Sequence, residues 1–244
     1  MRLFILRHGT TYWNTLRKIQ GATNTPLDAK GEEIARISGR VLHKQGIHFH
    51  AVYSSPLNRA VRTAQLVSPG STIHTDQRLQ ELHFGLFEGR RLQDLIQDET
   101  SPFRYFYSQP EKYNEALLLL EKQAPEKGYE SFTSLIQRAS DFMRSVIEPL
   151  ASDTPADACI LISGHGALDR ALMMYIRRST VLTSFWGKGP LPNCGFCIVD
   201  VSVTEDTEGS RVRYFIEDEN KIYYDPELIH IPRLPSEQEN SSGN

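Results

Sequence analysis

Two stretches of this chain are runs of consecutive apolar residues, and segments with apolar residues at helical spacing follow each of them. The runs, at 3–6 and 159–163, lack the alternation of a half-exposed strand and are typical of strands buried on both faces of a parallel sheet. Strand and helix patterns alternate along most of the chain, which favours an α/β fold. We expect a three-layer α/β/α sandwich with a mostly parallel central sheet.

The same patterns place the individual elements. Strands are expected at 3–6, 51–54, 71–76, 159–163, 196–203 and 212–217, the last two as an edge hairpin around an acidic loop at 204–210. Helices are expected at 28–44, 55–67, 111–123 and 131–149, and from 164–166 to residue 176. Asp28 caps the first helix, while Ser55 and Pro56 open the second. Residues 12–27 show no periodicity and are expected to form an ordered loop.

Residues 86–130 interrupt the alternation and contain one helical pattern and a group of aromatic residues. No linker flanks them, so they are expected to be a helical insertion or cap, and 1–232 to be a single domain. The polar tail 233–244 is expected to be disordered.

Composition limits the partners. The 244 residues are 39% hydrophobic and 23% charged, which is typical of a soluble globular protein. A net charge of −3 argues against nucleic acid or an anionic membrane as the main partner. The chain starts without a signal-peptide pattern and has no apolar stretch long enough to span a membrane, so we expect a cytoplasmic protein.

The three cysteines are too few for a disulfide framework. Cys194 and Cys197 have the spacing of a redox or metal-binding pair. In the strand expected there, residues three apart point to opposite faces, so the pattern favours two separate thiols.

Four cationic or imidazole side chains lie directly after buried strands or at the first turns of helices. Arg7 and His8 end the first strand, and His165 follows the strand at 159–163. Arg59 lies in the first turns of a helix, where the helix dipole disfavours a cation unless an anion is nearby. The triplet at 7–9 alone is compatible with a plain polar turn, but the carboxyl ends of neighbouring parallel strands meet at one edge, where ligands bind.

Phosphoryl transfer uses these residue types. A neutral imidazole attacks phosphorus, two guanidinium groups hold the phosphate oxygens, and a second histidine donates a hydrogen bond to an equatorial oxygen. Backbone N–H groups at the helix opening after Gly166 add to the anion site. An acid must protonate the leaving alkoxide, and Glu81 is the candidate because it follows a predicted strand.

Several motifs occur in an order that resembles a known family. They are Arg7-His8-Gly9-Thr10-Thr11, Gln20-Gly21, Ser54-Ser55-Pro56-Leu57-Asn58-Arg59-Ala60, Glu81-Leu82-His83-Phe84-Gly85, Ser163-Gly164-His165-Gly166 and Leu191-Pro192-Asn193-Cys194. From residue 2 to about 217 the chain resembles the histidine phosphatase (phosphoglycerate mutase-like) superfamily, on its phosphatase branch, with the insertion covered least.

The resemblance implies a role for each matching residue. His8 would be the phosphorylated nucleophile, with Glu81 as proton donor. The phosphate pocket would be formed by Arg7, Arg59, His165, Thr11, Asn14 and Gly166. The implied activity is hydrolysis of a small phosphorylated metabolite by a cap-covered site, with no metal and no cofactor.

Two details depart from the family pattern. Thr10 stands where the family often has Glu or Gln, which makes a substrate contact there less certain. The stretch at 128–131 resembles a Gly-Glu-Ser motif with one residue inserted, so Glu130 is a second candidate for the donor, although it also fits the start of a helix.

Alternative functions and sites remain open at this stage. One is a cofactor-primed mutase, although the basic pattern typical of the mutases is not found between 90 and 130; another is a non-catalytic binder of phosphorylated ligands.

His48 and His50 have the spacing of two metal ligands on one strand face. The cations Arg90, Arg91 and Arg104 are candidates for a second anion site or a solvated face, and the aromatic residues at 103–107 for a substrate platform or cap core. The oligomeric state is open, with a homodimer as one possibility.

Overall fold

The central element is one six-stranded sheet. The computed structural model describes residues 1–206 and 209–229, without the side chains of 205–210. The strand order is β3-β2-β4-β1-β5-β6. The strands β1 (Arg2–Arg7), β2 (Phe49–Ser54), β3 (Ile73–Thr75) and β4 (Cys159–Gly164) are parallel, whereas β5 (Phe196–Asp206) and β6 (Gly209–Lys221) run antiparallel at one edge. The expected mostly parallel sheet is confirmed.

The two apolar strands lie side by side in the middle of the sheet. Ile5 is in register with Ile162, and Arg7 with Gly164. The backbone N–H of His8 continues the ladder by donating to Gly164 O at 3.1 Å. The residues that follow β1 and β4 therefore emerge at the same edge, as the sequence predicted.

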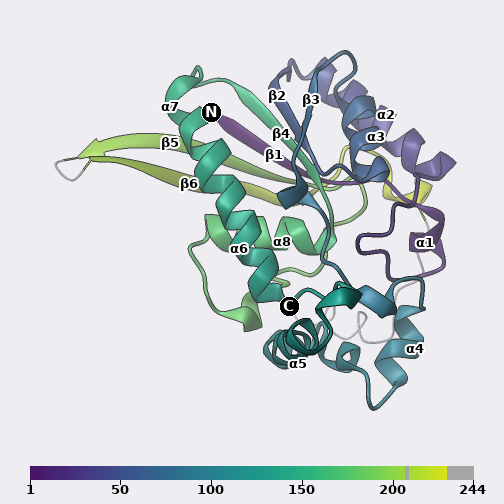
Figure 1. The fold of residues 1–244 in the computed structure, drawn as a ribbon. Helices are drawn as coiled ribbons and strands as arrows, with labels where there is room; N and C mark the ends of the chain where they lie inside the picture. The colour runs from purple at the N-terminus through teal and green to yellow at the C-terminus, as the bar shows by residue number, and fades with distance from the viewer. Residues whose placement is uncertain (207–208, 230–244) are drawn as a thin grey trace, which may run out of the picture.

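Helices cover both faces of the sheet (Figure 1). On one face lie α2 (Ala29–Lys44) and α3 (Asn58–Val67); on the other lie α6 (Phe132–Phe142), α7 (Glu148–Asp153) and α8 (Gly166–Ile176). The alternate residues of β1 belong to two separate cores, which makes the third layer necessary. Cys194 packs in the α2–α3 core and Cys197 in the other, so the two thiols diverge.

Three expected elements differ from the structure. The helix expected from Ser55 starts at Asn58, because the Ser55 N–H still donates to Ser163 O in the sheet ladder. The helix expected to end at Pro149 passes through a π-helical turn, Met143–Ile147, and continues to Asp153. Pro149 has no N–H to donate within the helix, and the π-helical turn before it lets the helix continue without that hydrogen bond. The loop at 12–27 contains a short helix, α1 (Tyr12–Thr15), which Thr11 caps.

The insertion is helical, as expected. It contains α4 (Leu92–Gln97), α5 (Pro110–Gln123) and several 3-10 turns, gathered at one end of the molecule (Figure 1). Phe103 and Phe106 are buried and pack on Tyr113, so most of the aromatic group forms the core of the insertion.

The edge hairpin is longer than the sequence predicted. Its strands reach Asp206 and begin again at Gly209, so they take up most of the loop expected at 204–210. The tail expected at 233–244 lies outside the described residues. Within 1–206 and 209–229, no helix is long and apolar enough to cross a membrane.

Candidate active site

A pocket of about 510 Å³ opens at the carboxyl ends of β1 and β4. Its lining includes six of the residues expected to form the site: Arg7, His8, Asn14, Arg59, Glu81 and Gly166. His165 lies beneath this lining, with its ring centroid 5.2 Å from that of His8. The structure thus brings together residues from four separate parts of the chain.

His8 is held as a neutral imidazole with one free nitrogen. Its Nδ1 lies 2.6 Å from Gly9 O; a carbonyl only accepts, so Nδ1 carries the proton and Nε2 keeps its lone pair. Burial, then the charges of Arg59 and Arg7, lower the pKa of His8 well below its usual value. An unprotonated Nε2 is the form that can attack an electrophile.

The backbone around His8 is fixed from two sides. The Gly9 N–H donates to Thr63 Oγ1 at 3.0 Å, and Asn193 Nδ2 donates to His8 O and Gly9 O at 3.1 and 3.2 Å. A Cβ on Gly9 would lie 2.5 Å from Gly31 O, so only glycine permits this approach to α2. The orientation of the His8 ring therefore depends on α2, α3 and the loop before β5.

Arg59 is fully buried beside His8. It donates to Gly21 O and Thr23 O, both at 2.7 Å, and its Nε has no partner. Burial lowers the pKa of Arg59 to about 10, at which it still carries its charge at neutral pH. The guanidinium group of Arg7 donates to Leu191 O, and its buried Nε also has no partner.

His165 is the extended N-cap residue of α8 and is completely buried. Neither of its ring nitrogens has a partner. Burial, followed by the charge of Arg59, lowers the pKa of His165 well below its usual value, so one of its nitrogens carries a proton and the other does not. Buried polar atoms without partners are rare, and here they belong to all three residues around His8: Arg7, Arg59 and His165. Such a set can hold an anion.

Glu81 lies at the helix opening that was expected to receive the phosphate. Its carboxylate accepts from the backbone N–H groups of Leu168 at 3.1 Å and Ala167 at 3.3 Å. The helix-opening amides after Gly166 are therefore bonded to Glu81 in this structure, contrary to the expected direct role toward an anion. Glu81 also follows a 3-10 turn, Gln77–Leu79, rather than a strand, since β3 ends at Thr75.

Glu130, the second candidate for the proton donor, is engaged elsewhere. It pairs with Arg138 at 2.6 Å, accepts from the His83 N–H at 3.1 Å, and does not line the pocket. Arg138 in turn donates to the backbone oxygens of Gln80 and Glu81. The pair therefore supports the segment that carries Glu81.

Of the remaining expected contacts, Asn14 lines the pocket and Thr11 does not. The Thr11 hydroxyl donates to Gln20 Oε1 at 2.9 Å, which positions the loop after α1. The hydroxyl of Thr10 donates to Asp28 Oδ1 at 2.7 Å.

The outer wall was largely missed by the sequence patterns. The pocket residues without an assigned role are Arg17, Lys18, Ile19, Gln20, Gly21, Phe84, Leu92, Phe106, Tyr107, Ala167, Trp186, Pro190, Leu191, Pro192, Asn193, Ile222, Tyr224, Pro226 and Ile229. Some belong to motifs of the resemblance, such as Asn193. Trp186 and the segment at 222–229 carry no periodicity that could have pointed to a pocket wall.

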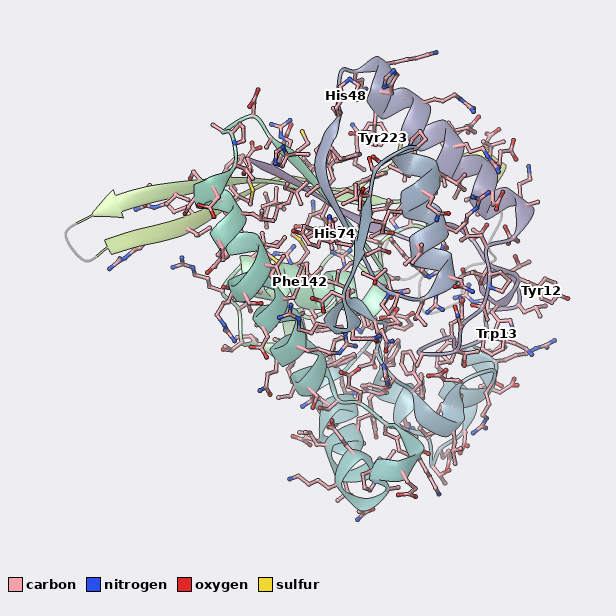
Figure 2. The ribbon with its side chains drawn as sticks, turned by 45° about the horizontal axis from the view of Figure 1, so that its top comes forward. Tyr12, Trp13, His48, His74, Phe142 and Tyr223 are labelled. Carbon is pink, nitrogen blue, oxygen red and sulfur yellow. The ribbon has the colours of Figure 1, made fainter. Side chains whose placement is uncertain are left out.

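The other candidate sites lie away from this pocket. Within the described residues, no group of three or more His, Cys, Asp or Glu residues is placed to hold a metal ion. His48 packs edge-to-face on His43, with centroids 4.9 Å apart, and lies far from the α1 segment that carries Trp13 (Figure 2). The arginines proposed for a second anion, Arg90, Arg91 and Arg104, do not line the pocket.

Comparison with known proteins agrees with this geometry. Over 101 residues the chain is 41% identical to a probable phosphoglycerate mutase GpmB of Serratia proteamaculans; the match covers 41% of this chain and 46% of that relative, about half its length. Bacillus stearothermophilus YhfR has a similar structure, with a TM-score of 0.70 and 27% identity over 91% of this chain and 97% of that one.

A second structure shows the same fold at lower identity. It is a phosphoserine phosphatase from Entamoeba histolytica in complex with phosphoserine, with a TM-score of 0.64 and 23% identity over 90% of this chain and 96% of that one. Residues 3–209 match the sequence profile of the histidine phosphatase superfamily, branch 1. This chain therefore belongs to the histidine phosphatase superfamily.

Proposed function

We propose that the protein is a phosphomonoesterase that hydrolyses a small phosphorylated metabolite through a phosphohistidine on His8. The observation that carries the proposal is the set of buried, unpartnered nitrogens of Arg7, Arg59 and His165 around a neutral His8. Burying such groups without a partner is unfavourable, and the oxygens of a phosphate would supply the acceptors.

In the first step, Nε2 of His8 attacks phosphorus and the bond from phosphorus to the leaving oxygen breaks. Arg7, Arg59 and the N–H of His165 donate to the phosphoryl oxygens, where negative charge redistributes. Glu81 acts as the general acid and gives a proton to the leaving alkoxide.

In the second step, water attacks phosphorus and the bond between phosphorus and Nε2 breaks. Glu81 takes the proton from the attacking water, and inorganic phosphate leaves. Glu81 suits both roles because it belongs to the pocket lining, next to Gly166. A Cβ on Gly166 would lie 3.6 Å from Arg7 Nε and 3.7 Å from Glu81 Oε2, so the acid lies near the phosphate-binding guanidinium.

Transfer of the phosphoryl group to a second substrate position, as in a mutase, is the other candidate. The similarity to a probable phosphoglycerate mutase, which extends over 101 residues, supports the mutase reaction. Hydrolysis is favoured by the outer pocket: the paired arginines Arg90 and Arg91 of the insertion lie outside the lining.

Hydrolysis of p-nitrophenyl phosphate in EDTA tests the mechanism. We expect turnover without metal, and a loss of about 10³-fold or more in His8→Ala. His48→Ala, which changes an exposed histidine outside the pocket, is the control and should keep wild-type activity. Equal rates for His8→Ala and wild type would exclude the phosphohistidine.

Trapping the phosphoenzyme separates the alternatives. A ³²P-labelled, acid-labile intermediate should form in wild type and lose its label to water even when a phosphoglycerate is present. Transfer of most label to the phosphoglycerate would support the mutase. Binding without turnover of any ester would indicate a non-catalytic binder.

A further inference from the structure

The phosphate site accounts for only the inner end of the pocket. A volume of about 510 Å³ lies within the range that accommodates a drug-sized ligand. A three-carbon phosphorylated acid would leave most of that space unfilled. The residues of the outer pocket wall therefore indicate the chemistry of the rest of the substrate.

One outer wall is aromatic. It combines Phe106 and Tyr107 of the insertion with Trp186 of the loop after α8; both phenyl rings lie 4.9 Å from the indole. The Trp186 indole N–H donates to Phe106 O at 2.6 Å, which ties the two segments together. Ile222 and Ile229 add apolar surface from the end of the described chain. This wall fits an aromatic or otherwise apolar body.

A second part of the outer wall carries Arg17 and Lys18. Their backbone pairs with the start of the insertion: Leu92 N–H donates to Arg17 O at 2.9 Å, and Ile19 N–H to Arg90 O at 3.0 Å. Arg17 has a φ of 52°, the left-handed region that non-glycine residues rarely adopt. Strained backbone of this kind persists where surrounding structure imposes it, and it is concentrated at ligand sites.

Lys18 is also held in place. Its ammonium group lies 5.7 Å from the centre of the Trp13 ring, a cation–π distance, and Trp13 projects from the α1 segment beside Tyr12 (Figure 2). Two adjacent cations therefore border the pocket on a segment whose backbone and side chains are ordered.

Among the residues that the structure describes, the pocket lining is richer in cations than in carboxylates. Arg7, Arg17, Lys18 and Arg59 belong to this lining, together with the carboxylate of Glu81. Arg7 and Arg59 are assigned to the transferred phosphate. Arg17 and Lys18 are neighbours in the sequence and place two further basic side chains in the wall of this pocket, in a protein whose net charge is −3.

We propose that Arg17 and Lys18 form a second anion subsite, and that the substrate is a phosphomonoester carrying a second anionic group on an aromatic or apolar body. This inference rests on the proposed function of the pocket. It replaces the insertion arginines with two residues that line the pocket itself.

A matched pair of substrates tests the subsite: 2-naphthyl phosphate, and the same ester carrying a 6-carboxylate. In wild type, kcat/KM should be about tenfold higher for the carboxylated ester. In the double variant Arg17→Gln/Lys18→Met, this preference should fall to about one, and more added salt should reduce the preference in wild type. Gln and Met keep much of the side-chain length while removing charge.

The control variant is Arg40→Gln/Lys44→Met. It makes the same change of net charge on exposed positions of α2 that do not line the pocket, and it should retain both activity and preference. Thermal unfolding of both double variants verifies that they are folded.

Each outcome is decisive. A wild-type enzyme without preference for the carboxylate, or a preference that persists in Arg17→Gln/Lys18→Met, would overturn the subsite. If Arg40→Gln/Lys44→Met also lost the preference for the carboxylated ester, the preference would depend on the overall charge of the protein. That result would overturn the subsite too. Failure of the proposed function is separate: it would appear as hydrolysis of both esters by His8→Ala.

Discussion

Two arginines in the described part of the chain are completely buried, and their surroundings differ. Arg170, in α8, donates to the Glu219 carboxylate at 3.1 Å and to Asn220 Oδ1 at 3.0 Å. Arg59, in α3, donates only to the neutral carbonyls of Gly21 and Thr23. One buried cation therefore has a direct ion pair with a carboxylate, whereas the hydrogen bonds of the other go to backbone carbonyls.

This difference suits Arg170 to stabilising the fold and Arg59 to binding a ligand. A carboxylate partner offsets the desolvation of Arg170, and the same partner leaves little of its charge for a ligand. Burial lowers the pKa of Arg59 to about 10, although the charges of Glu81 and Glu88 act in the opposite direction, so burial destabilises its charged form. An anion bound beside Arg59 would relieve that destabilisation, which supports the proposed role of Arg59 in holding a phosphate.

The largest effect is expected from removing the charge of Arg59. Arg59→Met should lower kcat/KM for p-nitrophenyl phosphate by about 10³-fold, because a buried charge-assisted contact to the transferred group is lost. Its unfolding midpoint should change less than that of Arg170→Met. Inorganic phosphate should raise the midpoint of wild type but not of Arg59→Met. A phosphate-induced shift of wild-type size in the variant would contradict the assigned role.

Arg170→Met should show the reverse pattern. Removing one partner leaves Glu219, which is mostly buried, with Arg177 alone, and we expect a loss of about 3 kcal/mol in the free energy of unfolding. For a chain of this size, that corresponds to a midpoint lower by roughly 6–12 °C in differential scanning calorimetry. The folded variant should keep most of its activity; a catalytic loss equal to that of Arg59→Met would erase the distinction.

A similar contrast between two carboxylates gives the next effect. Glu81→Gln should slow hydrolysis of an alkyl phosphate by about 10²-fold, and that of p-nitrophenyl phosphate much less, since nitrophenolate leaves without a proton. Glu130→Gln should lower stability through Arg138 while keeping the leaving-group dependence of wild type. If the dependence changes in Glu130→Gln instead, Glu130 is the donor.

The smallest effect concerns pH. Burial and the Arg59 charge lower the pKa of His165 well below 6.5, so below that pH the unfolded chain binds a proton that the folded chain does not. Stability therefore falls as the pH falls, by about 1.4 kcal/mol per histidine between pH 7.5 and 5.5.

His165→Gln should remove that contribution, as measured by urea unfolding at the two pH values. Asp169 acts in the opposite direction because burial raises its pKa, but it is present in both proteins. His50→Gln, an exposed change, is the control. An unchanged pH dependence in His165→Gln would show that this ring is protonated in the folded protein.

The inner site could be predicted from sequence because its signals are local. Apolar strands end at Arg7 and before His165, and Arg59 stands in the first turn of a helix. The parallel pairing of β1 and β4 then brings these positions together. The mostly parallel sheet followed from the same patterns.

The outer site could not be predicted in this way. Trp186 and Ile222 reach the pocket from loops whose course depends on tertiary contacts such as the bond from Trp186 to Phe106 O. Glu81 was identified for an incorrect local reason, since a 3-10 turn precedes it. The start of α3 was misplaced because the long-range bond from Ser55 to Ser163 prevails over the local Ser-Pro signal.

The position of β1 in the sheet also has a consequence for biosynthesis. Arg2 pairs with Cys159 on one side and with Asp200 on the other. β1 is synthesised well before both of its neighbours, because more than 150 further residues must be added before β4 is made, which takes roughly 8 to 30 s at ordinary elongation rates. During that interval the apolar strand β1 has no partner, and an unpaired apolar strand of this kind is prone to aggregation. The strand that leads to His8 thus becomes part of a sheet only late in synthesis.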